Sequence, residues 1–149
     1  MTTDSAWMQR AIDQAWLCPK SDHAFAVGCV IIDAQERELA TGYSRENDPK
    51  VHAEEAALAK LGDDPRLTTA TLYSTLEPCS QRASRPKPCL QLIQDAGIPR
   101  VVIAWREPDL FVENCIGVES LRSSGVEVTE LDYLADAAME PNSHLNLTG

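Results

Sequence analysis

The stretch TATLYSTLEPCSQRASRPKPCLQLIQDAGIPRVVIAW, residues 69–105, decides the fold class of this chain. Its β-branched and aromatic beginning predicts a strand over 69–76. Helix-forming residues predict a helix that includes 90–96, and Gly97 is a candidate for the residue that ends it. The apolar segment 100–105 predicts the next strand. Strands and helices that alternate through short connections are typical of a layered α/β domain.

The same alternation continues on both sides of this stretch. Apolar periodicity and β-branched runs predict helices over 5–17, 52–61 and about 115–123, and strands over 24–32, 38–44 and 126–131. No repeat or linker divides the chain, so we expect one domain over 1–131. The remaining residues, 132–149, read as a loose C-terminal tail.

Composition and charge exclude several classes of protein. The net charge of −10 disfavours a nucleic-acid partner, whose binding depends on lysine and arginine. No apolar run approaches the length of a membrane span, and the N-terminus lacks the pattern of a signal peptide. The five cysteines show no spacing typical of a disulfide framework. These features predict a cytoplasmic protein that does not contact a membrane.

Two short motifs carry metal-binding chemistry. His52 and Glu54 belong to the motif H-A-E at the start of a predicted helix. Cys79 follows Pro78 after a predicted strand, and nine residues separate Cys79 from Cys89. One imidazole and two thiolates match a catalytic zinc site, which typically leaves its fourth position for water. We expect Cys79 to open a helix whose dipole favours the thiolate. Glu54 beside the metal is suited to shuttle protons.

These motifs resemble the H-x-E and P-C-x-x-C signature of zinc-dependent nucleobase deaminases. The wider spacing between the cysteines is similar to that of the pyrimidine deaminases of riboflavin biosynthesis. TGYSRE (41–46) and EPDLFVEN (107–114) look closer to the fungal-type enzymes than to the bacterial ones, in which the deaminase is commonly fused to a reductase. The chain is too short for that second domain. The resemblance also covers AFAVGCVI (24–31), HAEEAAL (52–58), TLYSTLEPCSQRASRPKPC (71–89), GIPRVVIAWR (97–106) and LRSSGV (121–126).

The resemblance implies a fold, a cofactor and an activity. The fold would be the three-layer α/β/α arrangement of cytidine deaminases, with a central mixed sheet of about five strands. His52, Cys79 and Cys89 would bind Zn²⁺, and Glu54 would be the general acid and base. The reaction would be hydrolytic deamination of an amino-substituted pyrimidine, first of all the diaminopyrimidine 5′-phosphate of riboflavin biosynthesis. Relatives commonly associate, so we expect a homodimer or a larger homo-oligomer.

Three alternatives stay open from the sequence. The nearest is a deaminase of another small base, nucleoside or nucleotide, such as cytosine, cytidine, dCMP or guanine. An editing deaminase of tRNA or DNA shares the motifs, but the net charge of −10 disfavours it. A non-catalytic zinc module is disfavoured by Glu54, because a structural site needs a fourth ligand and no proton shuttle.

Candidate substrate contacts lie around the predicted metal site. The loop between the cysteines is a local basic cluster on an acidic chain, and arginine forks match phosphate oxygens. We therefore predict that this loop holds the phosphate of a small phosphorylated substrate. The segments at strand ends complete the prediction, since open α/β sheets bind ligands there. The candidate residues are Phe25, Ser44, Arg45, Glu46, Arg82, Ser84, Arg85, Lys87, Glu107 and Asp109.

Overall fold

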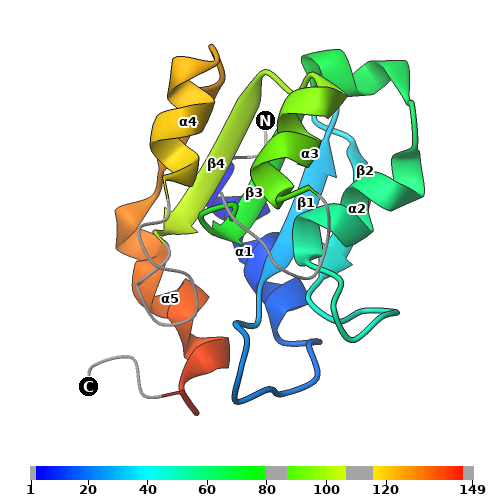
Figure 1. Ribbon diagram of the computed structural model, residues 1–149. Coiled ribbons are helices and arrows are strands. Elements are labelled where there is room, and N and C mark those ends of the chain that lie inside the picture. Colours follow the sequence, from blue (N-terminus) through cyan, green and yellow to red (C-terminus); the bar gives the residue numbers. More distant parts are fainter. Residues whose placement is uncertain (1–2, 80–86, 107–115, 146–149) are drawn as a thin grey trace.

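The computed structural model describes residues 3–79, 87–106 and 116–145, and the chain forms a five-stranded sheet (Figure 1). The sheet order is β2-β1-β3-β4-β5. Strand β1 is antiparallel to β2 and to β3, whereas β3, β4 and β5 are parallel to one another. The predicted mixed sheet is confirmed. The strands are β1 (Gly28–Ile32), β2 (Glu38–Tyr43), β3 (Thr71–Leu76), β4 (Arg100–Trp105) and β5 (Glu127–Glu130).

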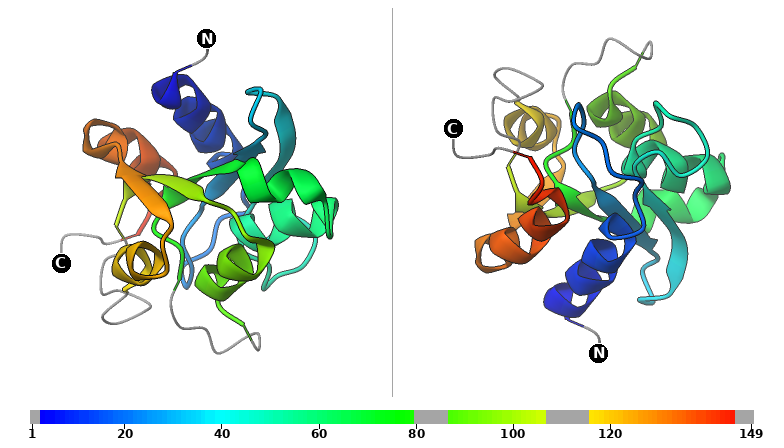
Figure 2. Two further views of the ribbon diagram at one scale, coloured as in Figure 1. Left: turned by 90° about the horizontal axis from the view of Figure 1, so that it is seen from above. Right: turned by 90° about the horizontal axis from the view of Figure 1, so that it is seen from below.

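Helices cover both faces of this sheet, as the two views of Figure 2 show. Helices α1 and α5 lie on one face, and α2, α3 and α4 lie on the other, so the predicted three-layer arrangement is confirmed. None of the described helices is long and apolar enough to cross a membrane. The helices are α1 (Asp4–Ala15), α2 (Ala53–Leu61), α3 (Cys89–Ala96), α4 (Gly117–Ser123) and α5 (Ala135–Met139), with 3-10 turns η1 (Pro65–Thr69), η2 (Asp132–Leu134) and η3 (Glu140–Asn142).

Strand β3 runs through the centre of the sheet and is buried on both faces. Leu72 and Leu76 point to the layer of α2, α3 and α4, whereas Tyr73 points to α1, where it packs with Met8. Successive side chains of a strand alternate between faces, so a strand between two helical layers needs apolar residues at nearly every position. Leu72, Tyr73 and Leu76 meet this requirement, and the small side chains of Ser74 and Thr75 are buried between them.

Gly42 allows α2 to lie directly against β2. A Cβ atom at this position would lie 2.3 Å from the carbonyl oxygen of Ala53 and 2.7 Å from the amide nitrogen of Ala57. Such distances are far inside van der Waals contact, so only glycine permits this approach of helix and strand. The close contact fixes the N-terminal turn of α2, which carries His52 and Glu54.

The first strand is shorter than the sequence predicted. Strand β1 begins at Gly28, and the expected extension over 24–27 is wrong. The backbone of Ala26 bonds to the side chain of Asn142, and the amide of Val27 donates to the hydroxyl of Ser44 at 3.1 Å. Val27 also accepts a backbone bond from the amide of Ser44 at 3.1 Å, but the backbone of Ala26 is bonded to a side chain and not to a neighbouring strand. Helix α1 likewise ends at Ala15, not at residue 17.

The C-terminal segment packs on the domain over 132–142, so the expectation of a loose tail is wrong there. Ala138 of α5 and Asn142 of η3 are each 1% exposed. The Asn142 side chain accepts from the amide of Ala26 at 2.6 Å and donates to its carbonyl at 3.0 Å. A small apolar residue and one paired amide are weak signals in a sequence, although together they anchor this segment.

An ion pair ties the start of α1 to β4 and makes a pH-dependent contribution to stability. Arg100 donates to both carboxylate oxygens of Asp4, at 3.0 and 2.7 Å, and Tyr73 donates to Oδ1 at 2.6 Å. The bonds from Arg100 are the main cause that holds the pKa of Asp4 below its usual value of 3.8. The pair therefore stabilises the fold fully above that value, and the contribution is lost as the pH falls through the lower folded pKa.

We expect Asp4→Asn to lower the free energy of unfolding by about 1 kcal/mol at pH 7, a figure reduced because both side chains remain partly in solvent. Urea unfolding at pH 7 and pH 3 measures this effect, and the difference from the wild type should shrink at pH 3. Asp13→Asn removes a charge from the same helix without touching Arg100 and is the control. An Asp4→Asn effect that is equal at both pH values would contradict the assignment.

Candidate active site

Three metal-ligating side chains meet near the C-terminal end of β3, the central strand of the sheet. The ligand atoms of His52, Cys79 and Cys89 all lie within 4.8 Å of one another. His52 Nδ1 is 3.3 Å from Cys89 Sγ and 3.7 Å from Cys79 Sγ. Both cysteines are buried, with exposed fractions of 6% and 0%. The structure thus brings together the imidazole and the two thiols that the sequence predicted as zinc ligands.

Each ligand is held at the end of a secondary-structure element. His52 is the N-cap of α2, and its amide donates to the Glu55 carboxylate at 3.3 Å. Cys79 lies three residues after the end of β3, and its carbonyl accepts from the amide of Leu90 at 3.1 Å. Cys89 is the first residue of α3, so two loop residues and one helix start converge on one point.

The predicted helix at Cys79 is wrong, because α3 begins at Cys89 and Cys79 lies in an irregular segment. The predicted electrostatic effect nevertheless arises, from a different helix start. The amide of Cys89, at the N-terminus of α3, donates to Cys79 Sγ at 3.2 Å. Free amides at a helix N-terminus favour a negative charge nearby, so α3 stabilises the Cys79 thiolate.

The pKa values of the two thiols are shifted in opposite directions. A hydrogen bond from Cys89 and then contacts with His52 lower the pKa of Cys79 to about 4. The Cys79 thiolate, together with complete burial, raises the pKa of Cys89. A divalent cation that binds both sulfurs would favour both thiolates, since metal binding displaces thiol protons. With one imidazole, this donor set fits a catalytic zinc ion with three protein ligands.

Glu54 is buried beside this donor set, with an exposed fraction of 4%. Its Oε1 accepts a hydrogen bond from Ser74 Oγ at 2.5 Å, and its carboxylate contributes to the raised pKa of Cys89. Residues two apart in a helix point in different directions, but His52 is the N-cap and lies outside the regular helix. Both side chains therefore reach one site, as the sequence predicted.

Comparison with known proteins assigns the family. The cytidine and deoxycytidylate deaminase zinc-binding region matches residues 1–105. The chain belongs to this family. The match includes all three donors and Glu54, so the geometry at the end of β3 is that of a zinc-dependent deaminase domain.

Curated relatives and solved structures agree with this deaminase family. The diaminohydroxyphosphoribosylamino-pyrimidine deaminase of Schizosaccharomyces pombe is 40% identical over 127 residues, which cover 83% of this chain and 31% of that protein. Riboflavin biosynthesis protein RibD of Aquifex aeolicus is 40% identical over 102 residues, or 68% of this chain and 27% of that protein. The chain therefore spans only about a third of the length of these curated relatives.

Solved structures with the same fold include Acinetobacter baumannii RibD in form 1. It aligns with a TM-score of 0.80 and 33% identity over 94% of this chain and 38% of that chain. The Aspergillus oryzae Rib2 deaminase in complex with DARIPP aligns with a TM-score of 0.78 over 92% of this chain and 88% of that chain. Its identity of 22% supports the shared fold alone.

Several predicted substrate contacts of the deaminase domain also hold its loops together. Ser44 is buried and accepts from the amide of Val27 at 3.1 Å. Arg45 donates to the carbonyls of Pro19 and Phe25, and the Phe25 ring meets Trp105 edge-on with centroids 5.3 Å apart. The register pairs the start of β1 with the ends of β2 and β3, so these residues lie at the metal-binding edge. Their contact with substrate stays a prediction.

Of the other predicted substrate contacts, Glu46 and Lys87 are among the residues that the structure describes. Glu46 pairs with Lys60 at 2.7 Å, while its Oε1 is buried without a hydrogen-bond partner within the described ranges. Lys87 is exposed and pairs with Asp95 at 2.8 Å, so a phosphate would compete with that carboxylate for it. The remaining candidates lie outside the described residues: Arg82, Ser84, Arg85, Glu107 and Asp109.

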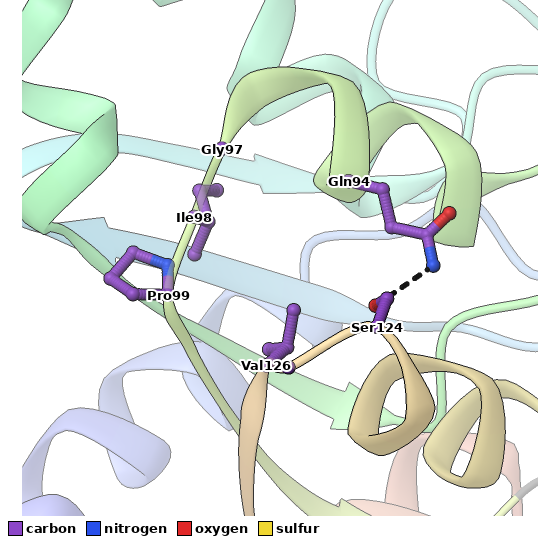
Figure 3. A pocket seen from close by; sticks show the side chains of 7 residues that line it. Gln94, Gly97, Ile98, Pro99, Ser124 and Val126 are labelled. Atoms are coloured by element: carbon purple, nitrogen blue, oxygen red, sulfur yellow. Dashed lines mark hydrogen bonds between the residues drawn. The ribbon is translucent and has the colours of Figure 1, made fainter.

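A cavity of about 310 Å³ opens near the N-terminal ends of β4 and β5 (Figure 3). Ile98 and Val126 line it, and a hydrogen bond of 3.1 Å from Gln94 to Ser124 joins its polar side. Its residues precede β4 and β5, whereas the metal donors follow the end of β3. No charged side chain lines this cavity among the described residues, so it does not match a phosphorylated substrate.

Proposed function

We propose that this chain catalyses the hydrolytic deamination of an amino-substituted pyrimidine. The observation that carries the proposal is the buried Glu54 carboxylate beside the convergent donors His52, Cys79 and Cys89. The diaminopyrimidine 5′-phosphate intermediate of riboflavin biosynthesis is the first candidate substrate. It is supported by the names of the S. pombe and A. aeolicus relatives and by the wide spacing of the cysteines.

The three donor residues and Glu54 have different roles in this reaction. The imidazole of His52 and the thiolates of Cys79 and Cys89 would hold a zinc ion, which would supply a Lewis acid and lower the pKa of water towards neutrality. Glu54 is placed to accept one proton of the attacking water and deliver it to a ring nitrogen, and then to pass the other proton of that water to the departing amino group, which leaves as ammonia. Its burial excludes bulk water, so the proton moves between the carboxylate and the substrate.

Zinc content and ammonia release together test this function. Zinc per chain is measured first, and ammonia release is then measured with the ribosyl and ribityl diaminopyrimidine phosphates, cytosine, cytidine, dCMP and guanine. Release from a diaminopyrimidine phosphate supports the proposal, and release from another member of the panel assigns a different small base or nucleotide. Zinc binding without ammonia from any substrate would contradict the enzyme and favour a non-catalytic zinc module.

The basic loop gives a prediction on substrate binding. We expect Arg82→Ala with Arg85→Ala to raise KM for a phosphorylated pyrimidine by about tenfold or more, because two charge-assisted contacts are removed. The KM for the dephosphorylated compound should not change. Arg66→Ala is the control, since Arg66 pairs with Asp64 in η1, away from the metal donors. An unchanged KM for the phosphorylated substrate would show that the loop does not hold phosphate.

Assembly and location are part of the same proposal. We propose a homodimer or larger homo-oligomer in the cytoplasm, without nucleic acid or membrane as a partner. The negative net charge of −10 supports the exclusion of nucleic acid. Light scattering on the purified protein measures the assembly, and a mass equal to one chain would contradict it.

A further inference from the structure

Ser74 is a polar residue in an apolar row of the central strand. Its side chain is fully buried, on the face of the sheet that α2 and α3 cover. The sheet register places it between Cys29 of β1 and Ile103 of β4. On its own strand, Leu72 and Leu76 flank it on the same face. A hydroxyl among such neighbours costs free energy unless it is hydrogen-bonded, so its bonding partners matter.

The partner that distinguishes this hydroxyl is the carboxylate of Glu54. Ser74 Oγ lies 2.5 Å from Glu54 Oε1 and 2.8 Å from the carbonyl oxygen of Leu76. A hydroxyl has a single hydrogen, which these two oxygens share. The carbonyl of Leu76 belongs to the same strand as Ser74, so the hydroxyl is fixed to β3. Through it, one oxygen of Glu54 is attached to the central strand of the sheet.

We propose that Ser74 is a positioning residue for the proton shuttle: its hydroxyl fixes the Glu54 carboxylate against β3 and so directs it towards the metal donors. This inference rests on the proposed function. Glu54 has three side-chain torsions and is anchored by its backbone only to α2. The bond to Ser74 selects one orientation from those torsions before substrate enters. Displacement of a reacting group by about 1 Å can cost about 100-fold in rate, so orientation is a large effect.

The test compares three variants of neighbouring buried hydroxyls. Ser74→Ala should lower kcat by about 10- to 100-fold while KM and zinc per chain stay close to wild-type values. Ser74→Thr keeps a hydroxyl and should recover most of the lost kcat. Thr75→Val is the matched control: Thr75 is also buried on the same strand, and its hydroxyl accepts a hydrogen bond from the amide of Gly28. Thr75→Val should lower the melting temperature without the fall in kcat.

Two results would overturn the inference. One is a kcat of Ser74→Ala within about threefold of the wild type; the other is a fall in kcat that follows melting temperature equally in Ser74→Ala and Thr75→Val. If the wild type releases ammonia from no aminopyrimidine, the proposed function fails, and crystal structures then decide the role of Ser74. A displaced or multiply oriented Glu54 carboxylate in Ser74→Ala would support positioning, and an unmoved carboxylate would refute it.

Discussion

Glu54→Gln is expected to lower kcat for deamination by about 10²- to 10⁴-fold, the range that a positioned general acid and base contributes. Glutamine has nearly the same shape as glutamate, and its amide oxygen can still accept the bond from Ser74. It cannot take up and release a proton, which the reaction requires. Because Glu54 lies outside the donor set, zinc per chain should equal that of the wild type.

Ammonia release and zinc content are measured on the same preparations of Glu54→Gln. Glu127→Gln is the control, since it removes an exposed carboxylate that pairs with Arg100. Both residues lie at the N-terminal ends of their strands, β5 and β4, and outside the metal donor set. A kcat within tenfold of the wild type would refute the role of Glu54 in proton transfer. Loss of zinc together with activity would instead assign Glu54 to the metal site.

Cys89→Ser is expected to weaken zinc binding by at least about a hundredfold and to abolish deamination. Loss of a residue that only orients a ligand already costs 10- to 100-fold in metal affinity, and Cys89 is itself a ligand. A serine hydroxyl stays protonated at neutral pH and is a poor replacement for a thiolate. Zinc binding stabilises a folded protein that holds the metal, so added zinc should raise the melting temperature of the wild type but not of Cys89→Ser.

Cys29→Ser provides the matched control for this variant. Cys29 is also fully buried, but it lies in β1, opposite Ser74 of β3, and outside the donor set. Both substitutions bury a hydroxyl in place of a thiol, so both should lower the melting temperature of the zinc-free protein. Only Cys89→Ser should lose zinc, and wild-type zinc affinity in that variant would refute the ligand assignment.

Much of the fold followed from local pattern. Strands β3 and β4 and helix α3 were predicted because their apolar runs, Gly97 and the preference for β-branched residues act over a few neighbouring positions. The ends of elements were less accurate. Strand β1 begins at Gly28, and just before it the backbone of Ala26 is bonded by Asn142, a residue more than one hundred positions away. A pattern in a short window cannot contain such a partner.

The candidate site shows the same division. His52, Glu54, Cys79 and Cys89 were found from two motifs, since metal-ligating and acid–base side chains are chemically distinctive. The role of Ser74 was missed, and the available signal was a hydroxyl between Leu72 and Leu76, the residues of β3 that point to the same face. That signal does not name Glu54 as its partner, because the bond joins residues from different elements.

The sequence by itself determined the layered α/β class and the identity of the metal donors. These properties depend on side-chain chemistry and on periodicities of two and 3.6 residues. Only the tertiary structure decided that α3 starts at Cys89 and directs its first amide to Cys79, that Asn142 secures residues 24–27, and that Ser74 holds Glu54. Each of these contacts joins residues distant in the chain, and the packing of helices against the sheet brings them within hydrogen-bonding distance.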